Sequence, residues 1–140
     1  MRFLIDTHCW IWATESSGKL NDTAAEMILS GENTVFFSAI SAAEIAIKVR
    51  LGKLKLPQPV AESVPGLLEK QRVTPMALDQ QHALRVADLP LHHRDPFDRL
   101  LIAQAQAEGI PLMTADTKIA EYDVDIIWAG REEAPPRQVQ

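Results

Sequence analysis

Arg2-Phe3-Leu4-Ile5-Asp6 opens the chain as a short apolar run that ends in an acid. A short, bounded apolar run of this kind is typical of a buried β-strand. Similar runs at residues 34–37, 111–114 and 124–128 predict three further strands. Helical patterns lie between the strands, at residues 21–29, 41–51, 59–71, 78–86 and 96–108. Strands that alternate with helices predict an α/β fold, in which helices cover both faces of a parallel sheet.

The helix predicted over residues 96–108 has the clearest boundaries. Asp95 stands at the N-cap position, Pro96 takes the first helical position, and Gly109 follows the last turn. These residue types favour a helix start and a helix end at those places. The helix also carries Asp98 in its first turn, where the helix dipole favours an acid.

Length and composition suit one domain with its own core, since the chain has 140 residues and 46% of them are hydrophobic. We expect this domain over residues 1–130 and a flexible tail over residues 131–140, where the sequence is polar and contains proline. No apolar run approaches the roughly 20 residues that span a bilayer. An acid at position 6 interrupts the run that a signal peptide would continue. Together with a single cysteine, Cys9, these features predict a cytoplasmic protein.

The formal net charge of −5 argues against a nucleic-acid partner, because Lys and Arg provide most of the affinity for phosphates. A carboxylate cluster that binds a cation would account for part of this negative charge. The basic residues are also grouped, with Lys48, Arg50, Lys53 and Lys55 close together in the chain. This group is either a solvated helix end or a surface that contacts RNA, and its composition fits both.

Acids distant in sequence stand near the predicted carboxyl ends of the strands, where parallel α/β folds bind their ligands. Asp6 directly follows the first strand, and Asp116 comes shortly after the strand at 111–114. Glu44 and Asp98 lie on predicted helices. Carboxylate oxygens suit Mg²⁺ or Mn²⁺. A cation among them would relieve their repulsion, activate water and neutralise charge on a phosphate.

Each acid also has a structural explanation. Asp6 could cap a helix that follows its strand, and Asp116 could cap the short turn after it. Glu44 completes a capping-box pattern with Ser41, in which its side chain would return a hydrogen bond to the Ser41 amide. On this pattern alone, capping and catalysis are equally good interpretations of Glu44.

Three stretches, taken in order, resemble one known family. They are FLIDTHCWIWA at residues 3–13, SAISAAEIAIKVRLGKL at 38–54 and LPLHHRDPFDRLLIAQAQAEGIPLMTADTKI at 89–119. The chain resembles a PIN-domain protein, and within that family the VapC-type toxins of bacterial toxin–antitoxin pairs. The resemblance extends over roughly residues 1–128. It implies a three-layer α/β/α sandwich with a mainly parallel central sheet, and RNA cleavage that depends on Mg²⁺ or Mn²⁺.

Carried onto this sequence, the resemblance implies that the catalytic and metal-binding acids are Asp6, Glu44, Asp98 and Asp116. Asp95 competes with Asp98 for the third place, although the proline beside it favours capping. Thr114, and less clearly Thr7, would support the site. Lys48, Arg50 or Arg99 would steer the RNA. The resemblance also implies a cognate antitoxin as partner and a homodimer.

Other interpretations are weaker. A phosphatase of the haloacid-dehalogenase type would need a second acid two positions after Asp6, where this chain has His8. A receiver-like domain would need a phosphoacceptor Asp after a middle strand, where Ser38 stands. A non-catalytic module that binds only a protein partner would tolerate loss of Asp6 or Asp98. We expect His92 and His93 to be an exposed pair in a loop.

Overall fold

The middle layer of the fold is a five-stranded sheet in the order β3-β2-β1-β4-β5, with all neighbouring strands parallel. Its strands are β1 (Arg2–Ile5), β2 (Thr34–Ser38), β3 (Thr74–Met76), β4 (Leu112–Thr114) and β5 (Ile126–Trp128). The structure is a computed structural model that describes residues 1–136. β1 is central, and Phe3, Leu4 and Ile5 are fully buried because helices cover both faces of the sheet. The predicted parallel sheet is confirmed.

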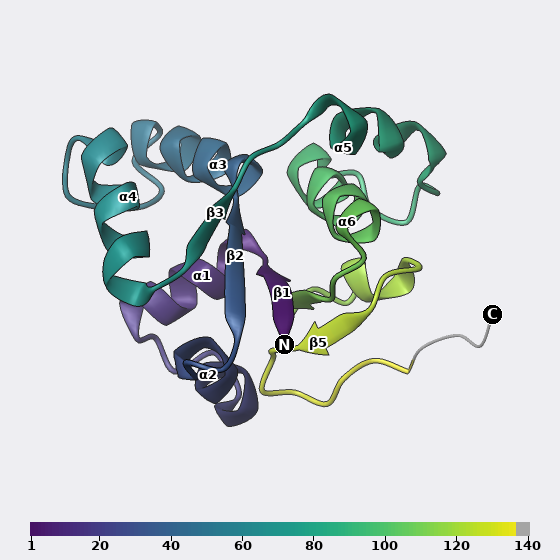
Figure 1. Cartoon of the computed structure of the whole chain (residues 1–140), viewed down its shortest axis with the longest axis horizontal. Coiled ribbons are helices and arrows are strands. Elements are labelled where there is room, and N and C mark those ends of the chain that lie inside the picture. The colour runs from purple at the N-terminus through teal and green to yellow at the C-terminus, as the bar shows by residue number, and fades with distance from the viewer. Residues whose placement is uncertain (137–140) are drawn as a thin grey trace.

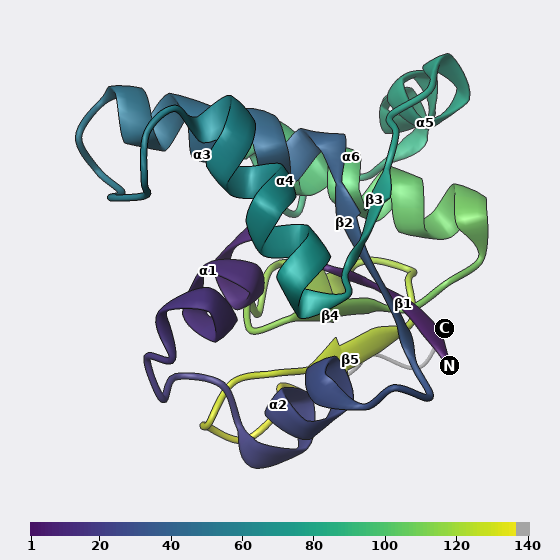
Figure 2. The ribbon, with the colours of Figure 1, turned by 60° about the vertical axis from the view of Figure 1, so that its left-hand side comes forward.

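Helices form the two outer layers (Figures 1 and 2). Phe3 and Ile5 face a core that includes residues of α1 (Thr7–Glu15), α2 (Asp22–Leu29) and α4 (Val60–Gln71). Leu4 faces the opposite core, formed mainly by α6 (Pro96–Glu108), with α5 (Gln80–Arg85) packed against that helix. α3 (Ala39–Arg50) contributes Ile45 to the first core and Ile40 to the second. The result is the expected α/β/α sandwich, to which η1 (Val86–Asp88) and η2 (Ile119–Glu121) add single 3₁₀ turns.

β3 was missed by the sequence pattern for a physical reason. Its three residues centre on Pro75, which has no N–H to donate and is usually found in edge strands or outside strands. β3 lies at the edge of the sheet and pairs only with β2, so one side of its backbone needs no partner strand. Neighbouring β2 therefore makes a strand of a segment whose own sequence does not favour one.

The start of α3 also differs from the prediction. Ser38 is the N-cap, and its hydroxyl accepts a hydrogen bond from the Ile40 amide at 3.0 Å. Ser41 therefore lies inside the helix, so the predicted capping box between Ser41 and Glu44 is wrong. At α6 the prediction is confirmed: Asp95 caps the helix and Gly109 ends it in the left-handed conformation.

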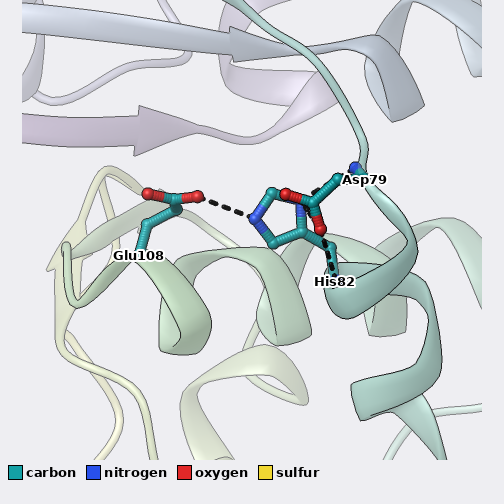
Figure 3. Close-up of side chains that lie close together, drawn as sticks. All are labelled: Asp79, His82 and Glu108. Atoms are coloured by element: carbon teal, nitrogen blue, oxygen red, sulfur yellow. Dashed lines mark hydrogen bonds and ion pairs between the residues drawn. The ribbon is translucent and has the colours of Figure 1, made fainter.

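His82 ties α5 to α6, the helix that carries Asp98 (Figure 3). Its Nδ1 accepts a hydrogen bond from the Asp79 amide at 3.1 Å, and its Nε2 lies 2.7 Å from Glu108 Oε1. One ligand atom from each of Asp79, His82 and Glu108 lies within 4.8 Å of the others, but both ring nitrogens already have protein partners on opposite sides of the ring. We interpret the cluster as a structural clamp.

The predicted tail is partly ordered. Arg131 donates a hydrogen bond to the Gly18 carbonyl and pairs with Asp22 at 3.2 Å, so residue 131 still packs on the domain. Residues 137–140, the last part of that predicted tail, lie outside the described residues. Within residues 1–136, no helix is both long and apolar enough to cross a membrane.

The His82 clamp predicts a defined loss of stability. His82→Leu keeps an apolar body but leaves the Asp79 amide and Glu108 without their partner. We expect the free energy of unfolding to fall by about 1–3 kcal/mol, because two hydrogen bonds worth about 0.5–1.5 kcal/mol each are lost. Urea unfolding of the native protein and the variant measures this change.

The matched control is Leu84→Ala on the same helix, because Leu84 is 68% exposed. It should stay within about 0.5 kcal/mol of the native protein. Equal stability of His82→Leu and the native protein would show that the clamp contributes nothing.

Candidate active site

Four acids converge at the carboxyl edge of the sheet. Asp6 directly follows β1, Asp116 follows β4, Glu44 lies on α3, and Asp98 lies in the first turn of α6. Parallel strands end at the same edge, which is why the acids after β1 and β4 meet there. Three of these acids are buried from water: Asp6 is 4% exposed, Glu44 5% and Asp98 6%.

Burial raises the pKa of two acids in this cluster, and neighbouring charges add to the shift of one of them. Burial is the largest cause that raises the pKa of Asp98 to about 8, and the charges of Asp95, Asp6, Glu44 and Asp116 add to it. Burial also raises the pKa of Asp6, although hydrogen bonds from Thr114 and the Cys9 amide oppose that shift. The structure therefore brings the four predicted acids into one electrostatically coupled group.

A cleft of about 400 Å³ opens beside these acids. Its lining comprises Asp6, His8, Trp12, Asp98, Ala115, Asp116, Thr117 and Glu132. Three carboxylates of the cluster therefore border a space that a cation and part of a substrate can enter.

Glu44 has one oxygen without a protein partner. Its Oε2 lies 3.2 Å from Lys48 Nζ, whereas its Oε1 is buried and accepts no hydrogen bond from residues 1–136. A buried carboxylate oxygen in this state is costly unless something else binds it. Together with an all-oxygen donor set, this fits a hard divalent cation.

The geometry separates Asp95 from Asp98. Asp95 Oδ1 accepts hydrogen bonds from the Phe97 amide at 2.8 Å and the Asp98 amide at 3.4 Å, so its carboxylate serves the helix N-terminus. Asp98 instead borders the cleft. Of the two, Asp98 is therefore the better placed to bind a cation.

The two threonines support the cluster in different ways. Thr114 accepts a hydrogen bond from the Asp116 amide at 3.1 Å and hydrogen-bonds the Asp6 side chain, so it links both acids. Thr7 donates to the Ser41 hydroxyl at 2.8 Å and thereby joins α1 to α3. The Thr7 hydroxyl therefore supports the acids indirectly, by holding α3, the helix that carries Glu44.

His93 belongs to the site, which the sequence interpretation missed. Its Nε2 lies 2.9 Å from Asp98 Oδ2 and 3.0 Å from Asp116 Oδ2, and its side chain is 13% exposed. The expectation of an exposed pair is wrong for His93, although the side chain of His92 is 43% exposed. The available signal was the position of His93 two residues before the N-cap Asp95, which places it at the entry to α6.

The three basic residues predicted to steer RNA have different environments. Lys48 lies at the rim, with its Nζ near Glu44 and 3.3 Å from His8 Nε2. Arg50 is exposed at the end of α3. Arg99 donates to the carbonyls of Pro90, Val86 and Leu89, so its guanidinium holds the loop before α6 in place. This geometry supports Lys48 for contact with a substrate and assigns Arg99 a structural role.

A model of the PIN domain matches residues 3–125. The chain belongs to the PIN-domain family. This match removes the phosphatase and receiver interpretations. Ribonuclease VapC16 from Mycobacterium tuberculosis is 40% identical over 63 residues, a match that spans 45% of this chain and 44% of VapC16.

Solved structures show the same fold at low sequence identity. VapBC2 from Rickettsia felis, bound to a promoter DNA fragment, matches with a TM-score of 0.68 and a sequence identity of 17%. The match covers 91% of this chain and 98% of that chain. DNA-bound VapBC from Salmonella typhimurium matches with a TM-score of 0.67 and a sequence identity of 16%, over 91% of this chain and 97% of that chain. VapBC-1 from nontypeable Haemophilus influenzae matches with a TM-score of 0.64 and a sequence identity of 19%, over 91% of this chain and 97% of that chain.

The raised pKa of Asp98 predicts how stability depends on pH without metal. Between the ordinary value of 3.8 and about 8, the folded protein retains a proton that the unfolded chain releases. The contribution of Asp98 is therefore fully present at low pH and is lost as pH rises, by up to about 1.4 kcal/mol per pH unit. We expect the thermal midpoint in EDTA to fall between about pH 5 and about pH 8.

Asp98→Asn should reduce the fall of the thermal midpoint with pH, because the asparagine side chain stays neutral over this whole pH range. Asp88→Asn removes an exposed acid and should leave the native profile unchanged. Adding Mg²⁺ at the upper pH should raise the midpoint of the native protein more than that of Asp98→Asn. Parallel profiles for the native protein and Asp98→Asn would rule out the proposed pKa shift.

Proposed function

We propose that this protein is an endoribonuclease that depends on a divalent metal ion and acts as the toxin of a toxin–antitoxin pair. The observation that carries the proposal is a cluster of four carboxylates, three of which border one cleft, with a buried oxygen of Glu44 left unpaired. The ribonuclease name of the relative VapC16 supports RNA as substrate.

Asp6, Glu44, Asp98 and Asp116 would hold Mg²⁺ or Mn²⁺. When bound, the cation supplies a Lewis acid that activates water and stabilises the charge that develops on the phosphodiester. The chain itself supplies the fixed orientation. Thr114 links Asp6 to Asp116, and the α6 N-cap places Asp98 at the cleft. Such preorganised carboxylates need little rearrangement when a cation binds.

The cleft rim offers groups that suit RNA. Lys48 Nζ can approach a backbone phosphate beside the acids, which is the kind of contact that provides electrostatic affinity. Trp12 lines the cleft next to Asp6 and can present an aromatic face to a base. Of the two, Lys48 places a positive charge beside the acids in a chain whose net charge is −5.

The partner would be a cognate antitoxin, as the VapBC composition of the structural neighbours suggests. An apolar groove of about 850 Å³ between α3, α4 and β3 offers a surface for an apolar segment of such a partner. Ala46, Val64, Leu68 and Met76 are among its lining residues. A homodimer remains a prediction.

The central test is cleavage of a mixed RNA pool by purified protein in Mg²⁺, in Mn²⁺ and in EDTA. We expect cleavage with either metal and none in EDTA. Asp6→Asn and Asp98→Asn should each slow cleavage by about 100-fold or more, the scale of losing one key electrostatic contact in a transition state.

Glu62→Gln is the matched control, because it removes an exposed acid on α4, away from the cleft lining. It should cleave like the native protein. Cleavage that persists in EDTA or in Asp98→Asn would contradict the metal-carboxylate mechanism. Equal behaviour of all variants in binding a protein partner, with no cleavage by any, would favour the non-catalytic module.

Trp12 provides a test of RNA contact that is separate from the metal. In an Asp98→Asn background, which keeps the RNA intact, Trp12→Ala should weaken single-stranded RNA binding by about 1–3 kcal/mol, the value of one stacked base. Trp12→Phe should retain much of the affinity. Fluorescence anisotropy with a labelled oligonucleotide measures both, and an unchanged affinity for Trp12→Ala would exclude stacking on this residue.

A further inference from the structure

We infer that His93 is a positioning residue that donates its Nε2–H to Asp116, lies against Asp98 and holds both acids for the cation, without itself binding metal. This inference rests on the proposed function of the acidic site, because it concerns how two of the proposed ligands are held. It assigns a task to a side chain that the carboxylate set leaves out.

The two ring nitrogens of His93 have different partners. The Asp95 amide nitrogen lies 3.2 Å from Nδ1, and an amide N–H can only donate, so Nδ1 must present its lone pair. The proton of the neutral ring is then on Nε2. That nitrogen hydrogen-bonds Asp116 Oδ2 at 3.0 Å and lies 2.9 Å from Asp98 Oδ2, so the ring contacts both carboxylates.

The same contact argues against His93 as a metal ligand. One nitrogen of His93 and one oxygen each of Asp98 and Asp116 all lie within 4.8 Å of one another, a spacing that a metal site could use. Metal at Nε2 would require the lone pair there and the proton on Nδ1. That proton would face the Asp95 N–H, leaving two donors opposed to each other. The arrangement therefore favours a donor role for Nε2.

His93 contacts two carboxylates that line the cleft without lining it itself. Asp98 and Asp116 are both lining residues, whereas His93 is not, and its side chain is 13% exposed. The two acids come from different elements, α6 and the loop after β4, and His93 Nε2 contacts both. Because a neutral ring adds no positive charge, it can hold the acids together without competing electrostatically with a cation.

The backbone around His93 is itself held in place. The His93 amide donates to the Tyr122 hydroxyl at 2.9 Å, and that hydroxyl donates to the Pro90 carbonyl at 2.8 Å. Arg99 Nη1 donates to the same hydroxyl at 3.1 Å and to the Pro90 carbonyl at 2.8 Å. Arg99 and Tyr122 thus fix the loop from which the imidazole reaches the acids. Partners that orient metal ligands in this way commonly change metal affinity when they are lost.

Nuclear magnetic resonance tests the proton position directly. Long-range ¹H–¹⁵N spectra of the full chain, with His93 assigned by its loss in His93→Gln, should show the neutral Nε2–H tautomer. Saturating Mg²⁺ should leave that tautomer in place. A proton on Nδ1, a doubly protonated ring, or loss of the Nε2 proton when Mg²⁺ binds would overturn the inference.

Mn²⁺ titration by calorimetry, without RNA, tests the positioning role. His93→Leu should bind Mn²⁺ about 10–100-fold more weakly, the usual effect of losing a partner that orients a metal ligand. His93→Gln retains an N–H donor near the Nε2 position and should recover much of the affinity. His92→Leu changes the exposed neighbour and should bind like the native protein.

The outcomes separate this inference from the proposed function. Native affinity in His93→Leu would overturn the positioning role whether or not the protein cleaves RNA. Weakened Mn²⁺ binding that His93→Gln restores would support the role even if no RNA were cut. Circular dichroism checks that each variant folds, and if His93→Leu does not fold, the tautomer in the native protein decides.

Discussion

Repulsion among carboxylates that are forced together at one edge of a buried sheet is the constraint on which the rest of this site depends. Asp6, Glu44 and Asp98 have little access to water. Burial raises the pKa of Asp98 most, and the charges of Asp6 and Glu44 add to that shift. Such an arrangement is unfavourable for a fold unless charge of opposite sign enters the cleft.

The surrounding residues reduce the conflict without removing it. Thr114 and backbone amides donate to Asp6 and Asp116, and Lys48 pairs with one oxygen of Glu44. His93 hydrogen-bonds Asp116 and lies against Asp98. One buried oxygen of Glu44 is left over. The protein therefore satisfies enough of the cluster to orient it and leaves enough unsatisfied for a cation to bind favourably. This balance suits the binding of a divalent cation, as the proposed function requires.

Several residues near the site have structural tasks that make the functional geometry possible. Asp95 serves the N-terminus of α6 and so sets the direction of the turn that carries Asp98. Arg99 uses its guanidinium on carbonyls of the preceding loop, which determines where His93 stands. His82 ties α5 to the far end of α6 (Figure 3). The parallel order β2-β1-β4 then brings Asp6 and Asp116 to the same edge.

The sequence by itself determined the α/β class, most of the elements and the four candidate acids, because apolar periodicity and helix caps are local and the acids follow predicted strands or stand on predicted helices. Only the tertiary structure decided between uses of the same residue types. The sequence around Glu44 fits a capping box, but the N-cap of α3 is Ser38. The Glu44 carboxylate is therefore not used to cap the helix. Asp95 and Asp98 differ in what their oxygens contact, which spacing cannot show. β3 exists because β2 offers it a partner, and His93 reaches Asp116 across 23 positions of sequence. Hydrogen bonds and repulsion between segments far apart in the chain act only after the sheet has brought those segments together.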